Sequence, residues 1–378
     1  MSKSSQDSLR ARVLAAFREQ GFELGESGLT WRKASASKND LRRLHAHALV
    51  YLRERARPKL EPKESLLLRY IASGSKINPT KIRPRLVAVQ RGSLEELLFR
   101  YARLHWSIPV SAGYGRRLRF LVWDEYHDKL IGLIGLSDPV FALGPRDRWV
   151  GWGKEAKRRR LKNVMDAFVL GAVPPYAQIL AGKLVALAVW SREVRVAFRE
   201  RYGARPSRIL GEAPGELALV TTTSAFGRSS LYNRIRFKEH LVYQSVGFTQ
   251  GTGDFPFLNG LYQDLFKLVR EKSQPTAKHA EWGRGFRNRR EVISKALKLL
   301  DLSPNFRVHG VRREVYVVPM GSDVRAFLRA ESARFEPHNY TFEDLAAYAL
   351  QRWIWPRAER DPRYRAFEPE SWRLWGSA

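Results

Sequence analysis

The chain has 378 residues, 44% of them hydrophobic, and a net charge of +29 from 67 Lys and Arg against 38 Asp and Glu. This composition excludes a mainly disordered protein and predicts a polyanionic partner, nucleic acid before an anionic membrane. Without Cys there is no thiolate nucleophile or Cys-based zinc site, and the His spacing suggests no metal. No apolar stretch is long enough to span a bilayer and the N-terminus lacks a secretory signal, so we expect a cytoplasmic protein without a membrane partner.

Residues 1–92 are expected to form a basic helical region. Asp7 or Ser8 can cap a first helix that stops at Gly21, and a second helix is predicted from Asn39-Asp40 through Arg57. Two interpretations remain open for this region: it grips nucleic acid itself, or it packs as a cap on the main domain.

Residues 93–320 are expected to form a mixed α/β core. Two apolar runs separated by DEYHDK predict an antiparallel hairpin, and the apolar run before Pro174 predicts a buried strand. Further along, the pattern predicts a helix from Leu184 to Phe198, a strand, a short helix and another strand. The segments are LRFLVW (118–123), LIGLIGL (130–136), LALVTT (217–222), GRSSLYNRIRF (227–237) and LVYQSV (241–246).

The C-terminal part adds a predicted helix over 261–272, a strand EVYVVP over 314–319 and an amphipathic helix near 342–355. Residues 321–378 are expected to be a helical and irregular extension. The whole pattern predicts the α+β class, with a mixed sheet flanked by helices.

A short turn between the Pro-Pro break and the next helix is a candidate anion site. Backbone N–H groups in such a turn, and at the helix start that follows, are expected to face outward and to bind phosphate. The residues assigned to this site are Gln178, Leu180, Ala181, Gly182 and Lys183.

Clusters of basic and aromatic residues predict a path for nucleic acid, because Lys and Arg neutralise phosphates and exposed Trp stacks on unpaired bases. The densest cluster surrounds Trp149, and a second one follows Trp282. The residues assigned to nucleic-acid binding are Arg146, Arg148, Trp149, Lys154, Lys157, Arg158, Arg159, Arg160, Arg228, Arg234, Arg284, Arg287, Arg289 and Arg290.

The order of hairpin, strand, turn, helix, strand, Tyr-bearing short helix and strand resembles the Gcn5-related N-acetyltransferase fold. In that family Gln/Arg-x-x-Gly-x-Gly/Ala binds the pyrophosphate of acetyl-CoA, and Gln178-x-x-Ala181-Gly182-Lys183 occupies this place here with Ala and Lys as departures. The resemblance implies acetyl-CoA or another acyl donor as cofactor. It also implies that Tyr232 is a general acid.

Polar residues near the proposed cleft complete the candidate site. Asp138 is the candidate base, provided that burial raises its pKa, and Thr222 and Ser224 are expected to bind polar substrate groups. A metal nuclease would need converging carboxylates, but the chain has no D-x-D pair or E-x-K signature.

A resemblance to the DruA-type family, named for a component of the Druantia anti-phage systems, covers about residues 95–320. It is carried by GYGRRLRFLVWD, RDRWVGW, LGAVPPY, AGKLVAL, VTTTSAFGRSSLYNR and SVGFTQGTGDF. It implies an anti-phage or mobile-element setting with nucleic acid, DNA ahead of RNA, as the object of action. The fold also resembles phage Mom-type DNA modification enzymes.

Three functions remain open on this reasoning. The first is an acetyltransferase-like enzyme that modifies nucleic acid, and the second is a non-catalytic nucleic-acid-binding component of a defence system or mobile element. The third is a Mg²⁺-dependent nuclease.

Overall fold

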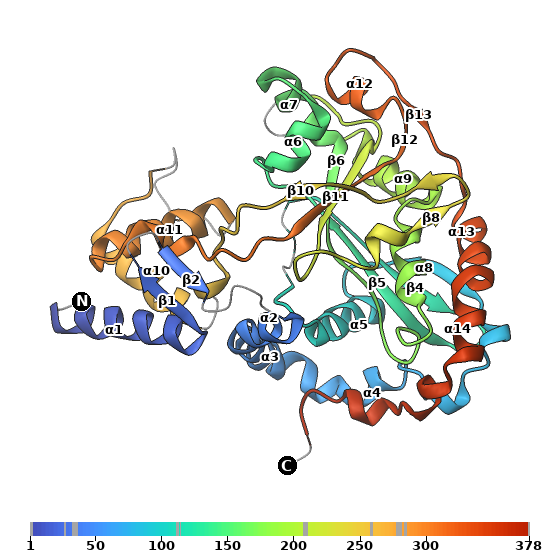
Figure 1. The fold of residues 1–378 in the computed structure, drawn as a ribbon, viewed down its shortest axis with the longest axis horizontal. Coiled ribbons are helices and arrows are strands. Elements are labelled where there is room, and N and C mark those ends of the chain that lie inside the picture. The colour runs from blue at the N-terminus through green and yellow to red at the C-terminus, as the bar shows by residue number, and fades with distance from the viewer. Residues whose placement is uncertain are drawn as a thin grey trace.

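A seven-stranded mixed sheet forms the middle of the molecule (Figure 1). The computed structural model describes residues 3–25, 28–31, 37–110, 113, 115–206, 211–257, 260–276, 282 and 286–376. The strand order is β10-β11-β7-β6-β5-β4-β3, in which β6 and β7 run parallel and every other pair is antiparallel. This confirms the predicted α+β class. The strands are β3 (Pro84–Ala88), β4 (Arg117–Asp124), β5 (Lys129–Ser137), β6 (Val164–Ala172), β7 (Leu219–Thr223), β10 (Gln244–Phe248) and β11 (Glu314–Pro319).

Both faces of the sheet are apolar, because its strands place hydrophobic side chains alternately on opposite sides. In β4, Leu118, Phe120 and Val122 belong to one core cluster, whereas Leu121 belongs to another. The sheet therefore needs a helical layer on each face.

One face is covered by α8 (Ala181–Ala188), α9 (Arg192–Phe198) and α13 (Phe342–Ala349). The continuous helix predicted over 184–198 is wrong, since the chain leaves the helix and restarts after Ser191, which has extended φ and ψ. Trp190 explains the break: its indole is buried and donates to the Pro319 carbonyl at 2.8 Å. Tertiary packing thus overrides an uninterrupted helical pattern.

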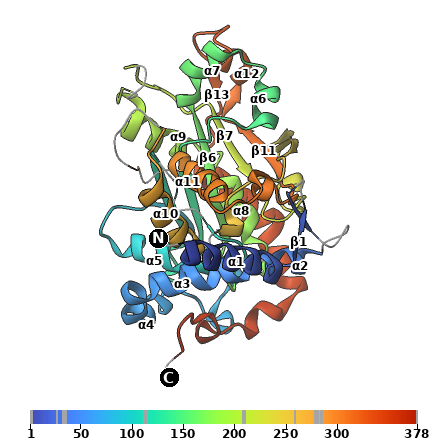
Figure 2. The ribbon, with the colours of Figure 1, turned by 90° about the vertical axis from the view of Figure 1, so that its left-hand side faces the viewer.

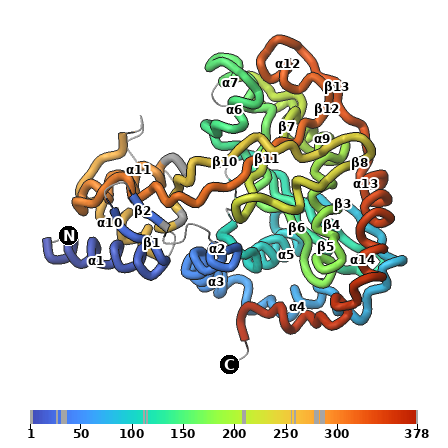
Figure 3. The backbone as a smooth tube through the Cα atoms, in the orientation of Figure 1, coloured from blue at the N-terminus to red at the C-terminus, as the bar shows by residue number. Residues whose placement is uncertain are grey.

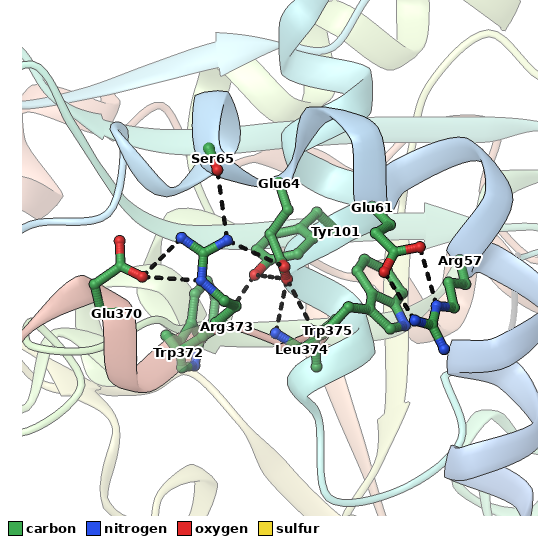
Figure 4. A network of polar contacts seen from close by, with 10 residues as sticks. All are labelled: Arg57, Glu61, Glu64, Ser65, Tyr101, Glu370, Trp372, Arg373, Leu374 and Trp375. Atoms are coloured by element: carbon green, nitrogen blue, oxygen red, sulfur yellow. Dashed lines mark hydrogen bonds and ion pairs between the residues drawn. The ribbon is translucent and has the colours of Figure 1, made fainter. Parts of the chain in front are cut away.

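The opposite face is covered by α4 (Glu64–Leu68), α5 (Leu94–Ala102) and the last residues of the chain, which run along the lower edge to a point near α4 (Figure 3). The buried Glu64 carboxylate fixes this C-terminal segment (Figure 4). It accepts hydrogen bonds from the Tyr101 hydroxyl at 2.8 Å and from the Leu374 amide at 2.7 Å, and it pairs with Arg373 at 3.5 Å. Gly74 permits a close approach of the same segment, because a Cβ there would overlap the Tyr364 carbonyl.

A separate module stands beside the sheet, at the left of Figure 1 and toward the viewer in Figure 2. It combines residues from two distant parts of the sequence around one apolar cluster. Phe17 lies at its centre, edge-to-face against Phe257 at 5.2 Å and Phe306 at 5.7 Å. The elements are α1 (Lys3–Glu19), β1 (Phe22–Gly25), β2 (Gly28–Trp31), α10 (Leu261–Lys272) and α11 (Phe286–Leu299).

The remaining elements connect these layers, and most of them are short. The single helix predicted through Arg57 is two helices, of which the first is capped by Ser37 in a capping box with Asp40. None of the helices in the described part of the chain has the length and apolar character that a membrane crossing requires. These elements are α2 (Lys38–Leu44), α3 (Ala46–Leu60), α6 (Gly144–Val150), α7 (Lys154–Arg160), α12 (Val324–Leu328), α14 (Trp355–Arg360), β8 (Arg236–Phe237), β9 (His240–Leu241), β12 (Gly321–Ser322) and β13 (Glu336–Pro337).

Candidate functional site

The candidate site lies where the two parallel strands separate. β6 and β7 pair from Val164↔Leu219 to Asp166↔Thr221, after which β6 continues along β5 and β7 along β11. Thr221 Oγ1 donates to Asp166 at 2.7 Å at the last paired position. Burial raises the pKa of Asp166 to about 6, against the opposing influence of Thr221 and Arg146.

The turn that was predicted to bind an anion uses most of its donors internally. The N–H groups of Gln178, Leu180 and Ala181 donate to the carbonyls of Pro175, Ala177 and Tyr176, and that of Lys183 donates to Leu180. Outward-facing N–H groups were therefore the wrong expectation for these four residues. Gly182 sits in the first turn of α8, where an added Cβ would lie 3.2 Å from a Leu231 methyl group.

Three basic side chains gather at the start of α8. Lys183 Nζ lies 4.9 Å from the ring centroid of the buried Trp353. The pKa of Lys183 is lowered, first by burial and then by the positive charges of Arg234 and Arg352. Within the described ranges, none of these three cations forms an ion pair with a carboxylate. The cluster, called here the Lys183 cluster, therefore has an uncompensated positive charge.

Tyr232 lies beside this cluster in a single 3₁₀ turn (Tyr232–Arg234), shorter than the helix predicted over 227–237. Its ring stacks on Tyr243 at 4.8 Å and meets Tyr316 at 5.2 Å. Burial raises the pKa of Tyr232 to about 12, so the hydroxyl keeps its proton near neutral pH. Its assignment as a general acid stays a prediction.

A buried carboxylate that the sequence did not single out lies next to Tyr232. Glu314 accepts hydrogen bonds from the Tyr316 hydroxyl, from Ser245 Oγ at 2.7 Å and from Asn233 Nδ2 at 3.4 Å. Burial alone would raise its pKa, but these donors bring the pKa below its ordinary value. The exposed Arg228 reaches the same carboxylate at 3.7 Å. An anionic group is thus held beneath a surface arginine.

The other predicted catalytic residues have partners within the fold. Thr222 Oγ1 donates to the Ala167 carbonyl at 2.9 Å, across the separating strands. Ser224 Oγ donates to the Gly227 carbonyl and accepts from the Glu314 amide at 3.1 Å. Asp138 pairs with Arg116 at 2.6 Å. To act as a general base, Asp138 would have to release Arg116. To bind substrate, the hydroxyls of Thr222 and Ser224 would have to give up these hydrogen bonds. The roles given to these residues therefore stay predictions.

The basic residues of α6 and α7 form a ridge above the sheet, near the top of Figure 1. Arg146 is fully buried, which makes the predicted phosphate contact wrong for this residue. Asp147 instead joins Arg146 at 2.7 Å and Lys157 at 2.8 Å. Trp149 is half-buried, with Arg325 above its ring at 5.6 Å. The exposed cations of the ridge are Arg148, Lys154, Arg158 and Arg159.

The remaining residues that were predicted to bind nucleic acid lie in different surroundings. Arg159 and Arg160 line a cavity of about 330 Å³ that also contains Glu212 and Glu331, so its charge is mixed. Arg289 lies over the Tyr262 ring at 5.7 Å, and Arg290 is exposed. Arg284 and the side chain of Arg287 lie outside the described residues. No group of three or more His, Asp and Glu that could hold a metal is found in the described ranges, and the Mg²⁺-dependent nuclease stays a prediction.

Comparison with known proteins identifies the family. A family model described as Druantia protein DruA matches residues 35–330. The chain belongs to the DruA family. One relative, the Druantia protein DruA of Escherichia coli (strain UMEA 4076-1), is 36% identical over 364 residues, which cover 95% of this chain and 89% of that protein. No solved structure matches the chain.

The matched range places most of the candidate site within the DruA family region. Lys183, Arg234 and Glu314 lie inside residues 35–330, whereas Arg352 and Trp353 come from beyond it. Sequence reasoning missed Arg352 because no local pattern indicates that the turn after α13 lies beside the start of α8. It missed Glu314 because a single Glu at the start of a strand carries no motif.

Proposed function

We propose that this chain is a nucleic-acid-binding component of an anti-phage defence system, and that the Lys183 cluster grips a backbone phosphate. The proposal is supported by the name of the E. coli relative and by the net charge of +29. The observation that carries it is the uncompensated charge of Lys183, Arg234 and Arg352.

The charges of the Lys183 cluster favour an anion. Lys183 is partly buried whereas Arg234 and Arg352 are exposed, and the pKa of Lys183 is lowered first by its burial and then by repulsion from these two positive charges. A bound phosphate would supply the missing negative charge and raise that pKa again. Arg offers planar, bidentate donors to phosphate oxygens, and Lys offers a point charge. Two Arg and one Lys therefore suit a phosphate without reading base sequence.

A pair of charge-matched variants tests this site. Arg352→Ala removes a cluster cation, whereas Arg363→Ala removes an exposed cation that already pairs with Asp361 at 2.6 Å. Both lower the net charge equally. In fluorescence anisotropy titrations, Arg352→Ala should weaken DNA binding for every sequence and reduce the slope of log K against log[salt] by about 1. Arg363→Ala should bind like the wild type. Equal effects of the two variants, or no binding by the wild type, would refute the proposal.

A second candidate function is modification of nucleic acid by an acetyltransferase-like core. It is favoured by the order of elements: hairpin β4–β5, then β6, the turn, α8 and β7, with a Tyr in the next short turn. Because the turn donates most of its N–H groups internally, the Lys183 cluster would be the main partner of a donor's pyrophosphate. The acyl donor would then lie between the separated strands.

Nucleoside mass spectrometry separates the two functions. DNA and RNA are isolated from cells that express the wild type or Tyr232→Phe. A new nucleoside mass with the wild type alone would support modification and identify the transferred group. An unchanged nucleoside spectrum would exclude modification in those cells and leave the binding proposal standing.

A further inference from the structure

Phe141 is an exposed aromatic residue on a rigid loop. Its residue surface is 62% exposed, and it lies between β5 and α6, at the edge of the basic ridge. The Trp residues that the sequence suggested for base stacking are half-buried at this site. Phe141 instead presents the open aromatic surface.

A buried arginine holds the backbone of this loop. Arg146 has no exposed surface, and its two terminal nitrogens donate to the carbonyls of Val140 and Phe141, each at 2.9 Å. Its remaining donors contact Asp147, which also accepts from the Leu143 amide at 3.1 Å. Trp152 donates to the same carboxylate at 3.1 Å. The loop is thus fixed at several points while the Phe141 ring stays in solvent, which lowers the entropy cost of binding through that ring.

One lysine lies against the ring, and other cations of the same helix are exposed. Lys157 Nζ lies 4.5 Å from the Phe141 ring centroid and 2.8 Å from Asp147, so it is fixed in place. Lys154 and Arg158 are exposed on the same helix, and Arg158 makes only a long surface pair with Glu155 at 3.9 Å. An exposed ring beside a helix with exposed cations matches a nucleobase and its neighbouring phosphates.

We propose that Phe141 stacks on an unpaired nucleobase while the cations of α7 bind the adjacent phosphates. The inference rests on the proposed nucleic-acid-binding function and specifies its substrate as single-stranded or locally unpaired nucleic acid. Bases in an intact duplex are stacked on one another and offer no free face to Phe141. Recognition by this ring is independent of base identity, since every base has a π-face.

The test compares three exposed-residue variants on a labelled oligothymidine and a duplex, each about 15 units long. Phe141→Ala should weaken single-strand binding about 5- to 100-fold and leave duplex binding within about twofold, as expected when one stacking contact is lost. Phe141→Trp should retain single-strand binding because it keeps a ring. Tyr126→Ala is the matched control, since Tyr126 is 52% exposed with Arg83 at 6.0 Å from its ring. It should bind like the wild type.

Each outcome is decisive. Unchanged single-strand binding by Phe141→Ala, with the wild type binding normally, would overturn the inference alone and leave Phe141 as a protein-docking residue. An equal loss for single strand and duplex would also overturn it, because it would indicate a backbone contact only. A wild type that binds neither probe would overturn the proposed function and this inference together.

Discussion

Replacing Asp166 with Asn should stabilise the protein at neutral pH. The carboxyl lies at the last paired position of β6 and β7 and accepts from Thr221 Oγ1 at 2.7 Å. Burial holds its pKa at about 6 instead of the ordinary 3.8. Asn keeps an oxygen that can accept from Thr221, but it cannot ionise.

The magnitude follows from linkage. A raised pKa means that the native state binds the proton more tightly than the unfolded chain does. The associated stability is fully present below the unfolded pKa and is lost as pH rises through about 6. The gap between 3.8 and about 6 corresponds to about 3 kcal/mol at 1.36 kcal/mol per pKa unit. Because the residue retains some solvent exposure, about 3 kcal/mol is an upper bound.

Urea denaturation of the wild type and Asp166→Asn measures this effect. The variant should have the higher free energy of unfolding by up to about 3 kcal/mol at pH 7.5, and by only about 1 kcal/mol at pH 4.5. Comparing the two proteins at each pH cancels the titration of all other groups. A variant less stable than the wild type at pH 7.5 would refute the reasoning, because it would show that the buried Arg146 holds Asp166 as a favourable ion pair.

Two further variants test the packing of the chain ends. Glu64→Ala should lower the free energy of unfolding by about 3 kcal/mol, since it leaves the amide of Leu374 without its buried acceptor and removes one of the two acceptors of the Tyr101 hydroxyl. Urea titration of the variant and the wild type checks this, and an unchanged free energy of unfolding would contradict a buried anchor at Glu64. Phe17→Ala should cost about 3–5 kcal/mol within the separate module, because its ring is fully buried against Phe257 and Phe306. Limited proteolysis should then cut within residues 257–311 before the sheet, whereas uniform cutting would contradict an independent module.

Local sequence patterns were sufficient to predict the bounds of some elements. The strand over 314–319 and the helix over 261–272 have the predicted bounds, because the first is a continuous buried run and the second has its apolar residues at helical spacing. The predicted helix over 342–355 begins correctly at Phe342, but a π-helical turn over Leu350–Ile354 separates it from α14. That turn places Trp353 under Lys183, a long-range contact without a local signal.

The candidate site was less predictable for the same reason. Lys183 and Arg234 were identified from the turn and the Tyr segment, but the third cation of the cluster comes from the C-terminal extension. Arg146 looked like its basic neighbours in sequence, and its burial depends on its contacts with the carbonyls of Val140 and Phe141 and with Asp147. Which arginines face solvent depends on tertiary contacts that composition cannot reveal.

The pairing of α1 with α10 and α11 has a consequence for synthesis. Residues 3–19 leave the ribosome long before their apolar partners, which extend to Phe306 and Val311. The buried face of α1 must therefore stay uncovered while nearly three hundred further residues are translated, at about 5–20 residues per second. A nascent chain of this kind needs tens of seconds of protection from aggregation, because the separate module can fold only after its distant segment has been translated.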